Sequence, residues 1–264
     1  MSNKKYELTD DARQLDRVKT VYRIRALRDF GEIKKGQLGG YIERESNLSH
    51  AGTAWVHDNA MVCDSARVIE NAQVKDRAFV GQEAILSKRV IVEHDARVFG
   101  HAILSDSAVV SGNARVSGRA IIKGRAHISD FASVEGKAFV SKFSIVSGLT
   151  KVSGNAELLI EHTVVFLYGN ATIRGNALIL SQNDIITVGG IGPGANILTA
   201  YRSKKKCGIE LAEESGGFHG TIGKFMHRVF YKNRNNNLYL EQYKATIAFI
   251  NYFFEINKNR GKHG

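Results

Sequence analysis

Four histidines in the middle of the chain, His57, His94, His101 and His127, are the side chains that could serve as a general base. An imidazole accepts a proton near neutral pH, and it works as a base only when neighbouring groups give it the right geometry. None of the four has a carboxylate at an obvious orienting position in the sequence. If the chain catalyses a reaction, His101 is the best-placed base, because it alone stands among cationic side chains.

Two cysteines, Cys63 and Cys207, form no CxxC pair and match no metal-ligand spacing. We therefore expect free thiols and no metal site. The start of the chain has no signal-peptide pattern, and no apolar run is long enough to span a bilayer. These features predict a cytoplasmic protein that makes no contact with a membrane.

The net charge of +11 is concentrated near the end of the chain. Residues 1–53 carry a net charge of +3, residues 54–198 carry +1 and residues 199–264 carry +7. A basic module often binds an anion such as nucleic acid, a nucleotide or an acidic protein surface, although such a surface can also serve only solubility. Two clusters would make first contact: Lys204, Lys205 and Lys206 at a predicted hairpin tip, and Arg228, Lys232 and Arg234 at the end of a predicted helix.

A six-residue pattern must position most of these side chains. From Val56 to Val164 every sixth residue is aliphatic, which gives nineteen consecutive positions. The residue two places earlier is Ala in fifteen of the nineteen cases, so both residues face the same side of an extended strand. A helix would repeat near 3.6 residues, and a plain hairpin meander would not hold one spacing so strictly.

Each six-residue unit ends in a turn pair such as Asp58-Asn59 or Gly118-Arg119. Gly, Asn and Asp tolerate positive φ, so we expect a corner after every short strand. Three strands and three corners close a triangular coil of eighteen residues. Such coils would stack about 4.8 Å apart by parallel pairing. The sequence therefore predicts an all-β solenoid, a parallel β-helix with a narrow core of Ala and aliphatic side chains.

We expect the solenoid over residues 51–198, with one interruption. At 165–170 the register slips by three residues, which predicts a loop at one corner. The aliphatic ladder then resumes at Ile173 and continues through Ile185, Ile191 and Ile197.

Caps are expected at both ends, because solenoid ends need covering. Residues 1–50 do not fit the repeat, and the alternating stretch at 22–27 predicts a strand in a small N-terminal β cap. Residues 199–264 predict a basic ββαα module. Its first helix would be capped by Thr221, and its second carries an apolar stripe from Leu240 to Phe254.

The residue before each aliphatic position points outward, and every eighteenth residue stacks on the same side. On the first side the column reads Arg67, Ile85, Ile103, Ile121, Phe139 and Glu157. On the second side it reads Trp55, Gln73, Ile91, Val109, His127, Ile145 and Thr163. Two adjacent apolar columns exceed what a soluble monomer usually exposes. They predict a homo-oligomer whose interface holds Ile85, Ile103, Ile121, Phe139, Ile91, Val109 and Ile145.

The third side is basic. Its column reads Met61, Phe79, Arg97, Arg115, Ser133 and Lys151, and the corner beside it stacks Glu83, His101, Arg119, Lys137 and Asn155. We call Arg97, Arg115, Arg119, Lys137 and Lys151 the basic lane. Such a lane could hold a phosphate-bearing ligand. The alternative is a solvated face that prevents edge aggregation.

Several stretches carry a family resemblance. They are Asp29-Phe30, Gly39-Gly40-Tyr41-Ile42, Asn47-Leu48-Ser49 and Trp55-Val56-His57-Asp58-Asn59-Ala60. These stretches resemble the start of the YdcK-like family, whose members are assigned as hexapeptide-repeat acyltransferases. With runs such as Ser111-Gly112-Asn113-Ala114-Arg115-Val116, the chain is also similar to bacteriophage hexapeptide-repeat proteins with a short C-terminal cap. The resemblance implies a left-handed β-helix, an exception to the right-handed crossover rule, and three-fold packing, hence a trimer.

The fold alone does not determine a function. Two classes of function therefore remain, in addition to a purely structural rod. The favoured one is a non-enzymatic, phage-encoded oligomer without a cofactor. It would bind and inhibit or sequester a host factor, a nucleotide or nucleic acid in the host cytoplasm, which would give it an anti-defence role. The alternative, implied by the resemblance, is an acyltransferase that uses acetyl-CoA with His101 as base. The charge distribution and the lack of a catalytic constellation favour binding.

Overall fold

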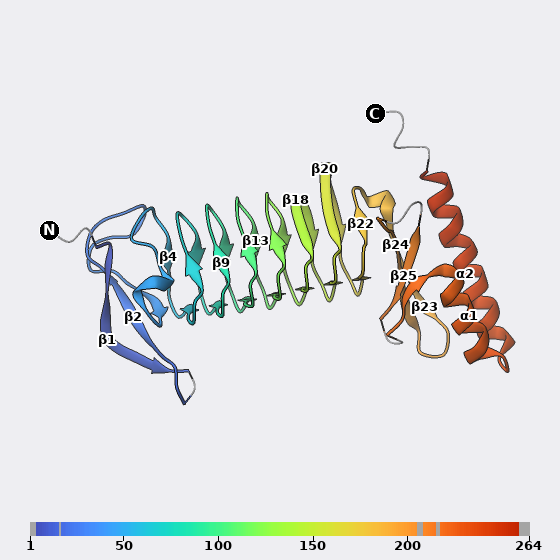
Figure 1. Cartoon of the computed structure of the whole chain (residues 1–264), viewed down its shortest axis with the longest axis horizontal. Helices are drawn as coiled ribbons and strands as arrows, with labels where there is room; N and C mark the ends of the chain where they lie inside the picture. Colours follow the sequence, from blue (N-terminus) through green and yellow to red (C-terminus); the bar gives the residue numbers. More distant parts are fainter. Residues whose placement is uncertain (1–3, 16, 205–207, 215–216, 259–264) are drawn as a thin grey trace.

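The computed structural model describes residues 4–15, 17–204, 208–214 and 217–258. The molecule is a rod with three parts in chain order: a β cap, a left-handed parallel β-helix, and an α+β cap (Figure 1). None of the helices within these ranges is long and apolar enough to cross a membrane.

The β-helix has three sides, and each coil contributes one short strand to each side. The first side contains β6 (Arg67–Val68), β9 (Ile85–Leu86), β12 (Ile103–Leu104), β15 (Ile121–Ile122), β18 (Phe139–Val146), β20 (Glu157–Leu167) and β22 (Leu178–Ile179). The second side contains β4 (Trp55–Val56), β7 (Gln73–Val74), β10 (Ile91–Val92), β13 (Val109–Val110) and β16 (His127–Ile128), followed by the second halves of β18 and β20. The third side contains β5 (Met61–Val62), β8 (Phe79–Val80), β11 (Arg97–Val98), β14 (Arg115–Val116), β17 (Ser133–Val134), β19 (Lys151–Val152) and β21 (Thr172–Ile173).

The predicted ladder forms the core of these coils. Each ladder residue from Val56 to Leu158 is 0 % exposed. The corners adopt the expected left-handed backbone, with φ of +50° at Asp58 and +57° at Asp76. Gly118 shows why some corners need glycine, because its φ is +69° and an added Cβ would lie 2.8 Å from the Gly136 nitrogen in the next coil. Close stacking of the corners therefore restricts the residue type as strongly as the backbone angle does.

The N-terminal cap is a three-stranded extension of the third side. It contains β1 (Tyr6–Gln14), β2 (Thr20–Ala26) and β3 (Leu38–Ile42), followed by the 3₁₀ turn η1 (Glu45–Asn47). Strand β3 pairs antiparallel with β2 and parallel with β5, so the cap sheet continues directly into the solenoid. The sequence reading identified the β2 strand but not β1, whose polar residues hide the strand pattern.

The cap buries groups of the first coil. Trp55, expected in the exposed column of the second side, is 0 % exposed, and its ring packs edge-on against Phe30 and Tyr6. The Lys5 ammonium is also buried and donates to the Ala54 carbonyl at 2.7 Å. The Tyr6 hydroxyl donates to the Leu48 carbonyl at 2.7 Å. These two side chains satisfy carbonyls that have no preceding coil to bond to.

The register slip lies earlier than predicted. Lys142 pairs with Ile160, eighteen residues on, whereas Ser144 pairs with Val165, twenty-one residues on. The three extra residues therefore fall between Ile160 and Val165 and not at 165–170. Val165 points into the core, whereas Val164, the last position of the predicted ladder, is 42 % exposed.

The parallel pairing stops at β22, before the expected boundary at 198. The chain passes through η2 (Gln182–Asp184) into an antiparallel sheet of β23 (Ile185–Ile191), β24 (Asn196–Arg202), β25 (Ile209–Glu213) and β26 (His219–Thr221). Two helices follow, α1 (Ile222–Asn233) and α2 (Asn237–Ile256). The Thr221 hydroxyl accepts from the Lys224 amide at the start of α1.

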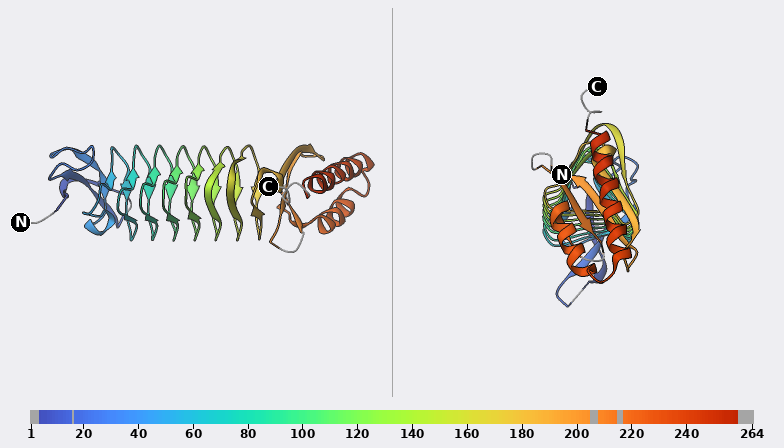
Figure 2. Two further views of the ribbon diagram at one scale, coloured as in Figure 1. Left: turned by 90° about the horizontal axis from the view of Figure 1, so that it is seen from above. Right: turned by 90° about the vertical axis from the view of Figure 1, so that its right-hand side faces the viewer.

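This sheet forms a layer between the last coil and the two helices (Figure 2). One face covers the solenoid: the Thr199 hydroxyl accepts from the Thr172 amide at 2.9 Å, and the Tyr201 hydroxyl accepts from the Arg174 amide at 3.0 Å. The other face packs against the stripe of α2, including Ile250, which is 0 % exposed. The module therefore supplies hydrogen-bond acceptors to amides of the last coil, and it forms a second core between its own sheet and helices.

Candidate functional site

The basic lane forms on regular rungs of the β-helix. Arg97 and Arg115 are direct neighbours on adjacent strands, and Lys151 follows two strands further on, beyond Ser133. Adjacent rungs are about 4.8 Å apart. All three cationic side chains are exposed. The third side therefore presents a row of cations at intervals fixed by the backbone.

The neighbouring corner supplies the second column of the lane. The His101 amide donates to the Gly118 carbonyl at 2.6 Å, and the Arg119 amide donates to the Gly136 carbonyl at 2.6 Å. The Lys137 amide continues the series by donating to Gly154 at 2.7 Å. His101, Arg119 and Lys137 therefore stack on three consecutive coils, as the eighteen-residue arithmetic predicted.

The five cations of the basic lane form no ion pair with any side chain that the structure describes. Cations on the other corners differ, since Arg77 pairs with Asp95 at 2.6 Å and Lys88 pairs with Asp106 at 2.6 Å. Unpaired guanidinium and ammonium groups in a fixed row are suited to oxyanions such as phosphate.

A groove of about 470 Å³ lies on the lane. Its lining consists of Asp95, Arg97, Asn113, Arg115, Phe131 and Ser133. The Phe131 ring is 63 % exposed at the corner opposite His101. An aromatic face beside two guanidinium groups can stack a planar group while the cations hold an anion. The sequence reading did not identify Phe131, although the spacing of eighteen residues places it beyond Asn113 in the same corner.

His101 has an orienting carboxylate, contrary to the expectation from the sequence. The Glu83 carboxylate lies 3.1 Å from His101 Nδ1, one coil earlier in the same corner column. The pair borders an open groove of about 710 Å³ that Phe79 and Phe99 also line. At the same groove, the Lys19 ammonium pairs with Asp64 at 2.5 Å. The stacking rule already placed Glu83 beneath His101, so the contact could have been predicted.

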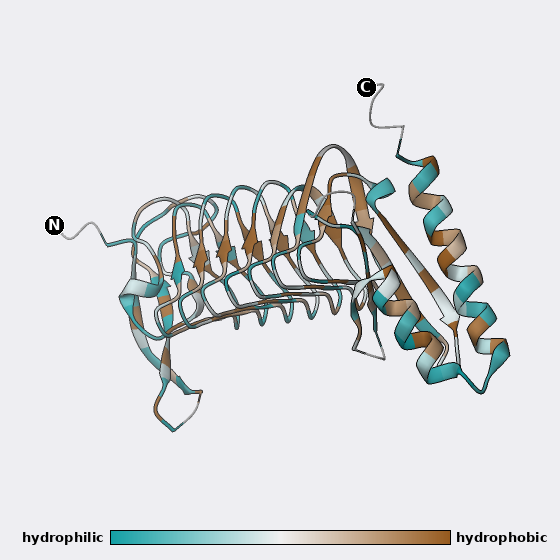
Figure 3. Ribbon diagram, turned by 45° about the vertical axis from the view of Figure 1, so that its right-hand side comes forward, coloured by the Kyte–Doolittle hydropathy of each residue, from teal (hydrophilic) through white to brown (hydrophobic). Residues whose placement is uncertain are grey.

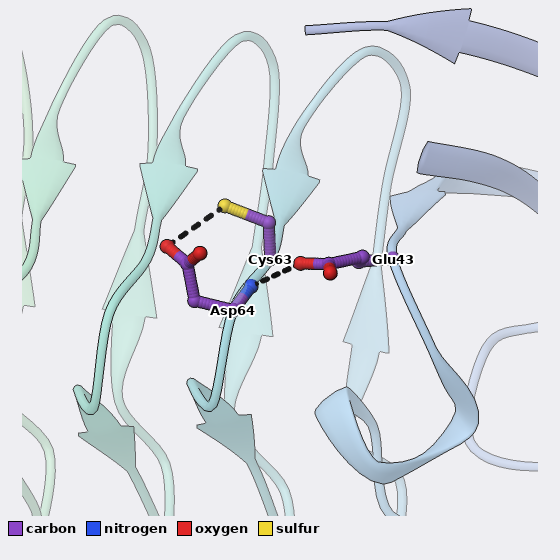
Figure 4. A group of neighbouring side chains, drawn as sticks. All are labelled: Glu43, Cys63 and Asp64. Atoms are coloured by element: carbon purple, nitrogen blue, oxygen red, sulfur yellow. Dashed lines mark hydrogen bonds between the residues drawn. The ribbon is translucent and has the colours of Figure 1, made fainter. Parts of the chain in front are cut away.

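Glu43, Cys63 and Asp64 bring three potential metal-ligating groups together within 4.8 Å (Figure 4). The Cys63 thiol is buried and points at the Asp64 carboxylate, 3.5 Å away. Burial and the Asp64 charge raise the pKa of this thiol to about 12, so it stays protonated near neutral pH. Asp64 accepts from the Gln82 amide at 2.9 Å in addition to its pair with Lys19. The cluster is a satisfied hydrogen-bond network that joins the cap to the solenoid.

Of the predicted hairpin-tip cluster, the structure describes one residue, Lys204. Lys204, expected to lie free of acids, pairs with Glu157 at 2.6 Å and donates to the Asn155 carbonyl at 3.2 Å. Lys204 therefore adjoins the corner column that contains Lys137. Lys205 and Lys206 lie outside the described residues.

The remaining cations, Arg228, Lys232 and Arg234, lie in or directly after α1, beyond the sheet from Lys204. Arg228 lies over the Phe218 ring, with 5.7 Å from its guanidinium carbon to the ring centroid. Arg234 lies over the Tyr231 ring at 5.4 Å. The helix module therefore adds separate positive charge at the far end of the rod.

The two apolar columns lie on adjacent sides of the β-helix, whose coils carry strands of hydrophobic residues (Figure 3). Ile103 is 39 % exposed, and its neighbours in the column, Ile85, Ile121 and Phe139, are partly exposed. The second column contains Ile91, Val109, His127 and Ile145 on consecutive coils. It ends at Phe166 rather than Thr163, because the inserted residues shift the pairing of Ile145.

The fold and these surfaces define the class of protein, a capped β-helix with a basic side and an apolar pair of sides. In comparisons with known proteins, no family model and no curated protein matches the chain. A functional assignment therefore depends on the geometry of the basic lane and the adjacent grooves.

Proposed function

We propose that the protein is a non-enzymatic oligomeric binding protein whose basic lane holds a phosphate-bearing anion, a nucleotide or a nucleic acid. The observation that carries the proposal is the row of five exposed cations without an ion-pair partner among the described side chains. In the setting suggested by the sequence resemblance, a phage-encoded protein of this kind would sequester the ligand, or inhibit a host factor that carries it, in the host cytoplasm. An anti-defence role would follow from that activity.

Electrostatics and stacking both support the choice of ligand. Phosphate contacts are charge-assisted, and guanidinium groups bind phosphate oxygens with two parallel hydrogen bonds. The Phe131 ring borders the groove that contains Arg97 and Arg115, which suits a nucleobase next to its phosphate. Acidic protein surfaces share the charge but lack bases to stack.

Oligomerisation would multiply these contacts. The apolar columns of the first and second sides are the surfaces for a trimer, in which three lanes run parallel to one axis. Each lane needs only modest affinity, because a ligand that engages two lanes gains from effective concentration. The third side stays free for the ligand in such an assembly.

The test uses two fluorescent probes, an ATP analogue and a single-stranded DNA of about 12 nucleotides, a length within the range that single-strand binding folds cover. Anisotropy titrations compare wild type with Arg97→Glu/Arg115→Glu. The matched control is Lys35→Glu/Lys224→Glu, which makes the same change of charge at exposed residues of the two caps, away from the lane and from the apolar columns. We expect the lane variant to lose binding at least tenfold and the control to retain it. Equal loss in both variants would reduce the effect to net charge, and equal binding by all three proteins would refute the lane.

A second candidate function is acyl transfer, favoured by one observation, the 3.1 Å contact between Glu83 and His101 Nδ1. A carboxylate at Nδ1 leaves Nε2 to accept a proton from an attacking group. In this case acetyl-CoA would bind and raise the melting temperature, by an amount equivalent to about 2.7 kcal/mol at a hundredfold excess over its dissociation constant. We expect no shift. A shift, together with acetyl transfer that disappears in His101→Ala and Glu83→Gln, would favour the enzyme.

A further inference from the structure

The solenoid ends unevenly on its second side. The last strand there is the second half of β20, where Ser144, Ile145 and Val146 pair with Val165, Phe166 and Leu167. The next coil would place another strand on these residues, but the chain leaves through η2 into β23. Within the described ranges, this half of β20 pairs only with β18, and β23 pairs only with β24. Two strand edges are therefore open at this end.

A cleft of about 610 Å³ lies where the missing strand would run. Its lining consists of Phe166, Leu167, Tyr168, Gly169, Asn170, Ala171, Gln182, Asn183, Ile185, Ile186, Thr187, Gly189, Ile197 and Phe253. Not one of these residues is charged, although the protein carries a net charge of +11. The volume is within the range of ligand-binding clefts.

The cleft lies along the solenoid-facing side of β23 and extends round the edge of this strand. Ile185 belongs to the face that covers the solenoid core, and Thr187, two residues further on, shares that face. Ile197 of the adjacent strand β24 also lines the cleft. Ile186, which packs toward the helices, lines it too, so the opening includes the edge of β23. Within the described ranges, no other strand pairs with this edge.

The opposite wall of the cleft contains two exposed aromatic rings and one backbone amide that bonds to a side chain. Phe166 is 51 % exposed and Tyr168 is 71 % exposed. The Phe166 amide donates to the Gln182 side-chain carbonyl at 3.3 Å. This contact replaces the main-chain carbonyl that a further strand would offer, and a peptide carbonyl could take its place.

We propose that this cleft binds an extended, uncharged peptide segment of a partner protein, which adds as a strand to the edge of β23. Main-chain hydrogen bonds would supply affinity, and alternate apolar side chains would lie against Phe166 and Tyr168. The uncharged lining excludes acidic or basic segments, since a charge would lose its hydration without gaining a partner. This site is separate from the basic lane and does not depend on the function proposed for it.

The test titrates three labelled heptapeptides that alternate threonine with valine, leucine or phenylalanine, with both peptide ends blocked. The cleft variant is Phe166→Ala/Tyr168→Ala, which truncates exposed rings. The control is Tyr252→Ala, an aromatic side chain that is 61 % exposed on α2 and does not line the cleft. Fluorescence anisotropy gives the affinity, and amide hydrogen exchange over residues 185–189 reports strand addition.

We expect at least one peptide to bind wild type and Tyr252→Ala with a Kd below about 100 µM, a range in which weak specific binding is measurable. The cleft variant should bind at least tenfold more weakly, as should a peptide whose alternate amides are methylated. Exchange over residues 185–189 should slow on binding. No saturable binding of any of the three peptides, or equal affinity of wild type and the cleft variant, would overturn the proposal. The Arg97→Glu/Arg115→Glu protein should bind the peptides normally, so this test and the lane test can fail independently.

Discussion

Replacing Lys5 with methionine should change how stability depends on pH, because the Lys5 ammonium is fully buried in the N-terminal cap. Burial, with a smaller contribution from Arg28, lowers the pKa of Lys5 from 10.5 to about 8 in the folded protein. The ammonium donates to the Ala54 carbonyl and lies 5.0 Å from the centroid of the Phe30 ring. These contacts reduce the cost of burying the charge without removing it.

The sign follows from proton counts. Above about pH 8 the folded state releases the Lys5 proton, whereas the unfolded chain keeps it until about 10.5. The unfolded state then binds more protons, so stability rises with pH in this window. The gain between pH 8 and 9 is about 1 kcal/mol. The charge costs about 3 kcal/mol below that window, at 1.4 kcal/mol per pH unit.

Urea denaturation followed by circular dichroism at pH 7, 8 and 9 measures this effect. Above pH 9 the Cys63 thiol opposes it, because burial raises its pKa from 9.0 to about 12 and stability falls as the unfolded thiol ionises. Lys5→Met should lose the rise between pH 8 and 9. At pH 7 its stability should stay close to wild type, since the unpaired Ala54 carbonyl costs about 1–3 kcal/mol and offsets the relief of the charge. An equal rise in Lys5→Met and wild type would refute the role assigned to Lys5.

Three further predictions test the assembly and the C-terminal cap. In sedimentation velocity, wild type should run as the proposed trimer and Ile103→Lys/Ile121→Lys as a monomer, because burying each isoleucine contributes about 1.5–3 kcal/mol before association costs. A monomeric wild type at micromolar concentration would contradict this prediction. Lys204→Glu should place a like charge beside Glu157 and loosen the module from the solenoid, seen as faster hydrogen exchange at the junction, whereas unchanged exchange would show that the ion pair is dispensable. Ile250→Ala should cost about 3 kcal/mol of stability in the C-terminal module, as core truncations do, and a loss below about 1 kcal/mol in thermal denaturation would argue against the second core.

The sequence specified the solenoid well because a single spacing governs both core and corners. The prediction of core positions from this spacing was wrong where a second pattern also fits the sequence. Val164 and Val165 are both aliphatic, so counting could not tell which one entered the core. Ile185 and Ile191 continue the spacing of six, but both lie in the antiparallel strand β23. A register shift between Val188 and Ile191 turns them to different faces, so Ile185 joins the solenoid core and Ile191 joins the core of the C-terminal module.

The positions of the candidate site residues were predictable wherever residues eighteen apart stack on successive coils. It placed every cation of the basic lane, and it also placed Glu83 beneath His101. It could not show that Lys204 folds back onto Glu157, because that contact depends on how the antiparallel sheet docks on the last coil. The open edge of β23 was equally hidden, since an edge is defined by a strand that is absent.

The salt dependence of single-stranded DNA binding tests the basic lane most directly. Each phosphate contact on a single strand contributes about −0.7 to the slope of log affinity against log salt. Five lane cations therefore predict a slope of about −3.5 between roughly 50 and 300 mM salt. Neutralising two of them in Arg97→Gln/Arg115→Gln should reduce the slope to about −2, whereas Lys35→Gln/Lys224→Gln in the two caps should leave it unchanged. The same slope in wild type and the lane variant would contradict the account.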